Sequence, residues 1–588
     1  MAFIAFLKSQ RHLIKVIAIA AVLSALVTAA IIIAVFVLLH REILPVEHEK
    51  ISRGTVVSNV VGCANIGTNI MEKGGNAVDV AIATLFCEGV AMPSTMGLGG
   101  GFLMTIYNKT TGEMWSLNAR EVAPAAATID MFQGNEKLSV SGGLSVAVPG
   151  ELMGYWSAYQ KFGGGVPWKD LIQPTIDICK KGVLVNGFVA GLLQEYKNDL
   201  YADSVLREIF FDPETNDTYT EGQYYTRPKL ARTLEIIATE GADALYNGSL
   251  TDEFVRDIQD HNGIITVDDL NSYRAEWQKP IEATLSGNIK LYTAPLPGSG
   301  SILTFILNVL DKFLDVKKPT SITNYQRIVE SFKFGYARRS ELGDSNFVDV
   351  EEILETLLSR RYGRRTRNMI RDHWTSSNAS YYGARFVMPE DHGTAHISVL
   401  TPSGDAVSVT STINYVFGAK FASNSTGIIL NDQMDDFSSP NITNVFGIPP
   451  SPSNYIIPGK RPMSSTCPSI ILNKNKEVVM IIGGAGGSKI TSSVAQVILN
   501  HLWYGMDLKA ASDAKRIHHQ LFPMEVAFEE EYLMEDTFVV EGLQRIGHNV
   551  SFSNGNGFAA ITAISRNEDN SVTGVFDRRR PGSVSYVY

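Results

Sequence analysis

The sequence predicts an α+β fold in which helices pack against sheets, preceded by one transmembrane helix. Three observations support this class. An uninterrupted apolar run covers Val16–Leu39, amphipathic helical patterns fill most of Leu152–Arg371, and strand patterns dominate from Thr394 onward. A helix or sheet with one apolar face buries it against another layer, and no low-complexity linker separates the helical and strand-rich parts. We therefore expect one folded unit after the apolar run.

Composition and charge exclude one class of partner. The chain has 588 residues, of which 45% are hydrophobic and 19% are charged, as in ordinary globular proteins with a large core. The formal net charge is -10, and the sequence has no long basic block. Nucleic-acid binding requires clustered positive charge, so we do not expect a nucleic-acid partner.

The apolar run Val16–Leu39 predicts a membrane anchor. It contains no charge and is long enough to cross a bilayer as a helix. The alternative is a cleaved signal peptide, but the run is longer than a usual signal core and no clear small-residue cleavage pattern follows it. Basic residues precede the run at Lys8, Arg11, His12 and Lys15. By the positive-inside rule, residues 1–15 are a cytoplasmic tail, residues 40–53 are a linker, and the remainder lies outside a single-pass type II cell-membrane protein.

Cysteines and sequons are consistent with an outside location. Four cysteines are too few for a disulfide scaffold and lack the C-x-x-C spacing of metal sites, so a thiolate metal site is not expected. No cofactor is predicted. Cys63 and Cys87 flank two helical patterns joined by a glycine turn, and this helical hairpin predicts a disulfide between them. Cys179 and Cys467 are then expected as buried free thiols. Candidate N-glycosylation sequons lie at Asn108, Asn216, Asn247, Asn378, Asn424, Asn441 and Asn549.

Individual elements follow from hydrophobic periodicity and from glycine and proline positions. A helix is expected at Asn76–Ala91, and the glycine-rich stretch after it leads into a strand at Phe102–Tyr107. Further helical patterns lie at Leu230–Glu240, Ile302–Phe313, Val350–Arg371 and Thr491–Trp503. Further strands are expected at Thr394–Leu400, Ala406–Thr412, Gly427–Leu430, Ser469–Leu472 and Val478–Ile482, and near Val526–Phe528 and Ala559–Ile564.

Two of these strands form a predicted hairpin that brings two hydroxyls together. The turn between them is rich in Pro, Ser, Gly and Asp, and if it is centred on Ser403, Thr394 lies directly opposite Thr412. Their Cβ atoms would then be about 5 Å apart. A β-branched pair that only packs is the alternative. The preceding residue, Gly393, favours a catalytic role over a packing role, because glycine permits a strained backbone in which a following hydroxyl attacks the preceding carbonyl.

Such an attack would release the Thr394 amine. A free α-amine has a pKa of about 8 and can accept the proton of its own hydroxyl, so a catalytic histidine is unnecessary. His396 lies on the same strand, but a lone strand histidine is more often structural.

A glycine loop follows the strand at Val478–Ile482. Gly483–Ser488 lies between this strand and a helix, where backbone N–H groups favour an anion or a developing oxyanion. Phosphate binding is the alternative, but the order of Ser488 and Lys489 does not fit G-x-x-x-x-G-K-[ST].

Six ordered blocks resemble the gamma-glutamyltransferase family. They are Leu117–Glu121, Asp391–His396, Thr410–Asn414, Asn431–Phe437, Pro458–Ser465 and Gly483–Gly487. The similarity covers essentially all of the chain after the linker. It implies an N-terminal-nucleophile hydrolase with a four-layer αββα sandwich, made as one precursor. Cleavage between Gly393 and Thr394 would leave a large subunit, 54–393, and a small catalytic subunit, 394–588, in one complex.

The resemblance also implies a role for each matched residue. Thr394 is the nucleophile, Thr412 orients it, and Gly486 and Gly487 supply the oxyanion N–H groups. The α-carboxylate of the glutamyl group is held by Arg120, Ser464 and Ser465, which suits the guanidinium fork. Its α-ammonium is held by Asn414, Gln433 and Asp436, whereas Asp435 supports the loop. Other members carry glutamate or glutamine at position 433, and a neutral amide accepts a hydrogen bond from an ammonium less strongly than a carboxylate does. We therefore expect Asp436 to carry most of that recognition.

The predicted activity is acyl transfer and hydrolysis on glutathione and related gamma-glutamyl compounds, with water, amino acids or dipeptides as acceptors. Two alternatives remain at this point. The same fold could prefer leukotriene-type gamma-glutamyl conjugates, or the chain could be a catalytically silent surface protein. The proline-rich stretch Ser438–Pro458 is expected to form either a flap beside the site or a rigid surface loop.

Overall fold

The computed structural model describes residues 15, 17–30, 52–389, 393–440, 449–554, 557–567 and 569–588. It divides into two compact units, Met1–Ile51 and Ser52–Tyr588. In the first unit, residues 17–30 are helical and exposed. The other residues of the predicted span lie outside the described residues, as do most of the predicted tail and linker. None of the helices in the described ranges is both long enough and apolar enough to span a membrane.

Two antiparallel sheets form the centre of the second unit. The first has the strand order β20-β1-β11-β12-β2-β3-β8 and the second has the order β19-β18-β14-β13-β10-β9. The strands of the first sheet are β1 (Gly54–Ser58), β2 (Gly101–Asn108), β3 (Glu113–Ala119), β8 (Glu276–Gln278), β11 (Ala395–Leu400), β12 (Ala406–Thr412) and β20 (Ser583–Val587). Those of the second sheet are β9 (Ile281–Leu285), β10 (Ile289–Thr293), β13 (Ser469–Leu472), β14 (Val478–Ala485), β18 (Ala560–Arg566) and β19 (Val572–Phe576).

Helices cover the outer face of each sheet. Those of the N-terminal half are α2 (Cys63–Glu72), α3 (Ala77–Ala91), α4 (Lys137–Val140), α5 (Glu151–Phe162), α6 (Trp168–Lys181), α7 (Gly187–Glu195), α8 (Lys197–Ala202), α9 (Ser204–Phe210), α10 (Pro228–Glu240), α11 (Asp243–Tyr246), α12 (Thr251–Asp260) and α13 (Val267–Ser272). The later helices are α14 (Gly300–Leu310), α15 (Ile322–Arg339), α16 (Glu351–Leu358), α17 (Arg360–Arg367), α18 (Ile490–Ile498), α19 (Leu508–Asp513), α20 (Tyr532–Glu535) and α21 (Thr537–Ile546). Smaller strands are β4 (Val183–Leu184), β5 (Phe211–Asp212), β6 (Asp217–Thr218), β7 (Tyr224–Tyr225), β15 (Ile517–His518), β16 (Val526–Glu529) and β17 (Val550–Ser553).

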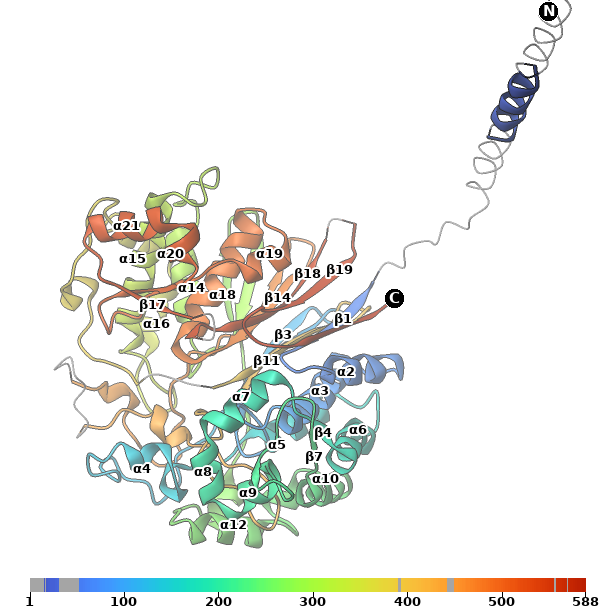
Figure 1. Ribbon diagram of the computed structural model, residues 1–588. Helices are drawn as coiled ribbons and strands as arrows, with labels where there is room; N and C mark the ends of the chain where they lie inside the picture. Colours follow the sequence, from blue (N-terminus) through green and yellow to red (C-terminus); the bar gives the residue numbers. More distant parts are fainter. Residues whose placement is uncertain are drawn as a thin grey trace, which may run out of the picture. The chain divides into compact units, whose positions relative to one another are not determined.

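These elements form four layers. Helices α2, α3 and α5 contact the first sheet, and α14, α18 and α19 contact the second. The sheets face each other through β11, β12 and β2 on one side and β13, β14 and β18 on the other. Figure 1 shows the two sheets side by side between the helices. The αββα arrangement implied by the resemblance is therefore confirmed.

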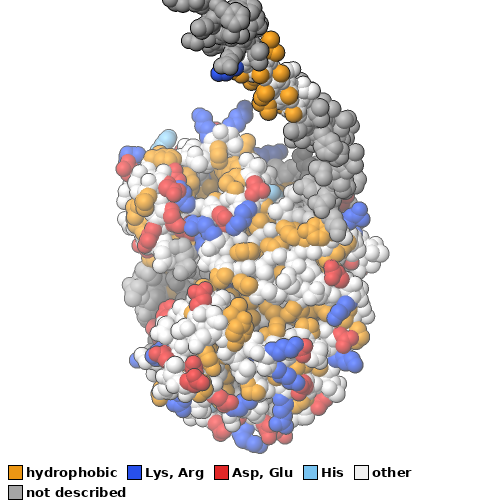
Figure 2. Space-filling view, turned by 45° about the vertical axis from the view of Figure 1, so that its right-hand side comes forward, with side chains coloured by type: hydrophobic (Ala, Val, Ile, Leu, Met, Phe, Trp, Pro, Cys, Tyr) orange, Lys and Arg blue, Asp and Glu red, His pale blue; other side chains and the backbone are white. Residues whose placement is uncertain are grey.

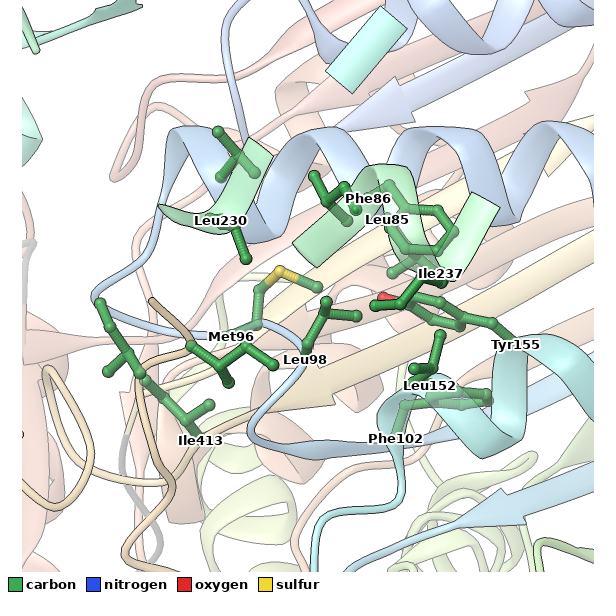
Figure 3. Close-up of a cluster of buried hydrophobic side chains, with 14 of the residues drawn as sticks. Leu85, Phe86, Met96, Leu98, Phe102, Leu152, Tyr155, Leu230, Ile237 and Ile413 are labelled. Atoms are coloured by element: carbon green, nitrogen blue, oxygen red, sulfur yellow. The ribbon is translucent and has the colours of Figure 1, made fainter. Parts of the chain in front are cut away.

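A large apolar core fills the space between the first sheet and its helices. Leu85 and Phe86 of α3, Tyr155 of α5 and Leu230 of α10 meet around a segment that follows α3 (Figure 3). Fully burying each such side chain contributes about 1.5–3 kcal/mol, so this contact is a major source of stability. It also ties α10 and the segment after α3 to the sheet that carries the predicted Thr394–Thr412 hairpin. On the visible face of Figure 2, basic and acidic side chains are interspersed.

Most predicted elements are present, several with ends shifted by a few residues, and three differ in kind. Gly427–Leu430 is not a strand and makes only single bridges at Ile429 and Leu430, because the backbone turns at Gly427, where φ is 70°. The Val350–Arg371 pattern forms two helices, and the Ser359 side chain caps the second by accepting from the Tyr362 N–H. The predicted helix Thr491–Trp503 begins one residue earlier and continues after Ile498 as a π-helix.

The predicted disulfide is confirmed. Cys63 and Cys87 are bonded between α2 and α3, with their Cα atoms 5.6 Å apart. Cys179 and Cys467 are free and buried, and burial raises the pKa of the Cys179 thiol to about 11. Of the predicted sequons, Asn108 is half-buried and Asn441 lies outside the described residues. The exposed ones are Asn216, Asn247, Asn378, Asn424 and Asn549.

Candidate active site

The β11–β12 hairpin brings Thr394 and Thr412 together. The register pairs Ala395 with Ser411, which is the register predicted from a turn centred on Ser403. The Thr394 hydroxyl donates to Thr412 Oγ1 at 3.4 Å, and both side chains are buried. Thr412 Oγ1 also accepts the Asn414 N–H at 2.9 Å. Thr412 is thus held in place by the backbone that follows it, with its oxygen directed at the Thr394 hydroxyl.

The backbone at Thr394 is strained. Gly393 and Thr394 have φ angles of 62° and 90°; glycine adopts a positive φ readily, but at a β-branched residue such as threonine it is a rare and costly conformation. A Cβ atom added at Gly393 would lie 1.9 Å from the Asn414 carbonyl oxygen, so no larger residue fits there. Strain of this kind costs on the order of 1–3 kcal/mol. Cleavage of the peptide bond between Gly393 and Thr394 would release it.

The glycine loop predicted after β14 is present between that strand and α18. Gly486 and Gly487 have φ angles of 136° and 60°, which only glycine adopts readily. A Cβ atom on Gly486 would lie 2.6 Å from Ala559 Cα, so the loop approaches the start of β18 closely. Gly486 and Gly393 line the same cavity of about 540 Å³. The loop and the strained peptide therefore face one space.

Arg120 and Asp436 form a buried ion pair. Arg120 follows β3, and its guanidinium also donates to the carbonyl oxygens of Pro462 at 3.3 Å and Met463 at 3.1 Å. Ser464 and Ser465 come directly after these carbonyls and are likewise buried. The structure thus brings together the residues predicted to hold a carboxylate, and it places one predicted ammonium ligand, Asp436, against them.

Two buried side-chain amides contact the loop that carries Asp436. Gln433 Nε2 donates to Asp436 Oδ2 at 2.6 Å, and Asn414 Nδ2 donates to the Asp432 carbonyl at 3.2 Å. Gln433 Oε1 and Asn414 Oδ1 are buried and accept no hydrogen bond from any residue in the described ranges. Since burying an acceptor without a donor is costly, these oxygens fit a ligand that brings N–H groups, such as an ammonium. Asp435 instead contacts Ser139, and burial raises its pKa to about 6.

His396 is a structural residue, as expected. It is fully buried between the two sheets, and its Nδ1 lies 2.7 Å from Thr410 Oγ1. Burial lowers its pKa to about 3, so the imidazole stays neutral and does not serve as a base near neutral pH. A Cβ on Gly483 would lie 2.1 Å from the imidazole Cε1, which explains why β14 carries glycine opposite it.

Sequence reasoning missed Arg580 and Glu88. Arg580 Nη1 donates to the Thr394 carbonyl oxygen at 2.6 Å, and the Glu88 charge partly offsets the burial that lowers the Arg580 pKa to about 10. Burial raises the pKa of Glu88 to about 8, although Ser58 and the Asn59 N–H donate to its carboxyl. The only signal for Arg580 was the Arg578–Arg580 run near the C-terminus, and nothing local distinguishes Glu88 from other helical glutamates.

Comparison with known proteins identifies the family. The family model described as gamma-glutamyltranspeptidase matches residues 63–587. The chain belongs to the gamma-glutamyltranspeptidase family. It is 44% identical over 534 residues to Scoloptoxin SSD14 of Scolopendra dehaani, with 90% of this chain and 91% of that protein covered. It is 38% identical over 504 residues to glutathione hydrolase proenzyme 1 of Schizosaccharomyces pombe, with 84% and 78% covered.

A solved gamma-glutamyltranspeptidase supports the same assignment. The crystal structure of the Helicobacter pylori enzyme superposes with a TM-score of 0.52 at 30% identity, covering 57% of this chain and 96% of that one. The family match spans both sheets apart from β1, and it includes Thr394, Thr412, Arg120, Asp436 and the Gly486 loop. The gamma-glutamyltranspeptidase resemblance inferred from the six sequence blocks is therefore confirmed.

Proposed function

We propose that this protein is a gamma-glutamyltransferase and glutathione hydrolase that cleaves itself between Gly393 and Thr394 and then uses Thr394 as its nucleophile. One observation carries the proposal. The Thr394 hydroxyl lies against Thr412, the Thr394 backbone is strained, and the glycine before it lines a cavity of about 540 Å³ together with Gly486. A hairpin with only a packing role has no need for this strain or for the buried ion pair beside it.

Self-cleavage begins with attack of Thr394 Oγ1 on the Gly393 carbonyl carbon. The Gly393 C–N bond breaks, the hydroxyl proton passes to the released nitrogen, and an ester joins the two residues. Water then hydrolyses the ester and restores the hydroxyl. Thr412 positions the attacking oxygen, and relief of the strained φ at Thr394 favours the forward step.

The two products would stay together because each sheet mixes strands from both. In the first sheet β1, from the large product, pairs with β11 and β20 from the small one, and β12 pairs with β2. In the second sheet β10 of the large product pairs with β13 of the small one. Separation would expose strand edges and the core between the sheets, so cleavage changes one bond and leaves the fold intact.

Substrate binding follows from the charges at the site. The free α-amino acid end of a gamma-glutamyl group carries a carboxylate for Arg120, Ser464 and Ser465. Its ammonium meets Asp436 and the two open acceptors, Gln433 Oε1 and Asn414 Oδ1. The ion pair between Arg120 and Asp436 is thereby replaced by two ion pairs with the substrate, one at Arg120 and one at Asp436.

Turnover is a two-step acyl transfer. The Thr394 amine, with a pKa of about 8, takes the hydroxyl proton as Oγ1 attacks the side-chain amide carbonyl. The Gly486 and Gly487 N–H groups stabilise the oxyanion. The C–N bond of the amide breaks, the amine leaves with a proton, and a glutamyl ester remains on Thr394. Water, an amino acid or a dipeptide then accepts the glutamyl group. Glutathione fits this chemistry, as do leukotriene-type conjugates with the same glutamyl end.

Replacing Thr394 tests the proposal. Thr394→Ala should remain a single chain on a denaturing gel and should not release the amine from a gamma-glutamyl anilide. Thr394→Ser keeps a hydroxyl and should restore slow cleavage and turnover. An uncut Thr394→Ala protein with wild-type activity would refute the mechanism.

We also propose that the run Val16–Leu39 anchors the protein with its catalytic unit outside the cell and glycosylated at the exposed sequons. The apolar length and the preceding basic residues support this. Alkaline extraction of membranes and treatment with an N-glycosidase test it. Release into the soluble fraction at alkaline pH, or an unchanged gel mobility after the glycosidase, would contradict the anchor or the glycans respectively.

A further inference from the structure

A buried arginine outside the active site lacks a counter-ion. Arg227 lies at the N-cap of α10, is only 3% exposed, and donates through Nη2 to the Gly427 carbonyl oxygen at 2.6 Å. Its Nε is buried without a hydrogen-bond partner, and no carboxylate of the described residues pairs with it. Guanidinium stays charged in proteins, and a buried charge without an opposite charge is strongly unfavourable.

The helix end beside Arg227 makes the local charge more positive. α10 runs from Pro228 to Glu240, and its N-terminus carries the positive end of the helix dipole. A cation is unfavourable at this end, whereas an anion is stabilised there. Two independent features, the buried guanidinium and the helix N-terminus, therefore require negative charge at the same place.

A cavity of about 240 Å³ opens at this point. Its wall includes Arg227, Lys229, Thr226, Tyr219 and Gly427. The acidic residue in the wall, Glu208, is already paired with Lys229 Nζ at 2.8 Å. Since one carboxylate faces two cations, the cavity keeps one net positive charge, which belongs to the more deeply buried Arg227.

We propose that this cavity is an anion site, and that it takes a small oxyanion such as phosphate, sulfate or a carboxylate. The guanidinium Nε and Nη1 edge would donate to the oxygen atoms, with Lys229 and the hydroxyls of Thr226 and Tyr219 around them. The site is separate from the cavity lined by Gly393 and Gly486, whose lining shares none of these residues.

The site is connected to the substrate loop along the chain. Arg227 holds the Gly427 carbonyl, and Thr233 Oγ1 holds the Thr426 carbonyl at 2.9 Å. Thr426 and Gly427 are followed within a few residues by Asn431–Asp436. This stretch includes Gln433 and Asp436, which are hydrogen-bonded to each other at the proposed glutamyl site. A bound anion would fix Arg227 and with it the start of this segment.

Calorimetric titration of the purified full-length protein with inorganic phosphate, sulfate, acetate and chloride tests the proposal. Wild type should bind phosphate or sulfate at a single saturable site, and its melting temperature should rise with the same concentration dependence. Arg227→Met should lose this binding. Lys229→Met should weaken it at least about tenfold, as expected for one charge-assisted hydrogen bond.

Arg232→Met is the matched control, because Arg232 is exposed on the same helix. It should bind phosphate as wild type does. Wild type that takes up none of the four anions would overturn the proposal even if Arg227→Met does not fold. Equal binding by wild type and folded Arg227→Met would overturn it as well.

Discussion

Replacing Gly393 by alanine should strongly slow self-cleavage without changing the residues proposed to carry out turnover. A Cβ at this position would lie 1.9 Å from the Asn414 carbonyl oxygen, whereas an ordinary contact begins at 3.4 Å. The backbone must therefore move by about 1.5 Å, the difference between these distances. A misplacement of about 1 Å at a reacting centre costs roughly 100-fold in rate. We expect cleavage of Gly393→Ala to slow by about 100-fold or more.

The assay follows the conversion of full-length chain into two fragments on a denaturing gel over time. Gly74→Ala is the matched control, because Gly74 also has a positive φ, 95°, but no atom lies within 4 Å of the added Cβ. It should lose about 1 kcal/mol of stability and cleave normally. After cleavage position 393 is only the end of the large subunit, so any processed Gly393→Ala should show wild-type kcat. Cleavage at the wild-type rate would refute the argument from strain and close contact.

Three further predictions concern charge at the site and in the core. Arg120→Lys lacks the planar guanidinium that contacts Asp436 and is proposed to bind the substrate carboxylate, so KM for a gamma-glutamyl donor should rise at least about tenfold. An unchanged KM would contradict the role assigned to Arg120. Gln433→Glu adds a carboxylate beside the ammonium position and should lower that KM severalfold at low salt, an effect that should shrink as salt is added. Glu151 is fully buried, and burial raises its pKa from 4.5 to about 8. Between these values the folded protein holds a proton that the unfolded chain has lost, so wild type should lose stability as pH rises through this range. Glu151→Gln has no carboxyl group to titrate, so its melting temperature should change less than that of wild type across the same pH range. Parallel plots of melting temperature against pH for the two proteins would contradict the raised pKa.

Local sequence determines the β11–β12 hairpin. The turn residues around Ser403 and the alternation on both sides are sufficient to set the register, because a strand slipped by one residue would turn its apolar side chains to the wrong face. The Cys63–Cys87 bond and the strand, glycine loop and helix after Val478 follow from similarly short patterns. The strand predicted at Gly427–Leu430 was wrong, because its apolar residues resemble a strand but the backbone turns at Gly427, where φ is 70°, and Arg227 binds the Gly427 carbonyl.

The ion pairs and the environment of Thr394 depend on tertiary structure. Arg120 and Asp436 are 316 positions apart, and Arg580 is 186 positions from the Thr394 carbonyl that it binds. No local pattern encodes such contacts, because they arise only when the sheets close on each other and bury the groups. The sequence by itself determined which residues can react and which segments are strands. Tertiary packing alone decided the strained φ at Thr394, the neutral state of His396 and the unpaired charge of Arg227, since burial and close contact produce each of them.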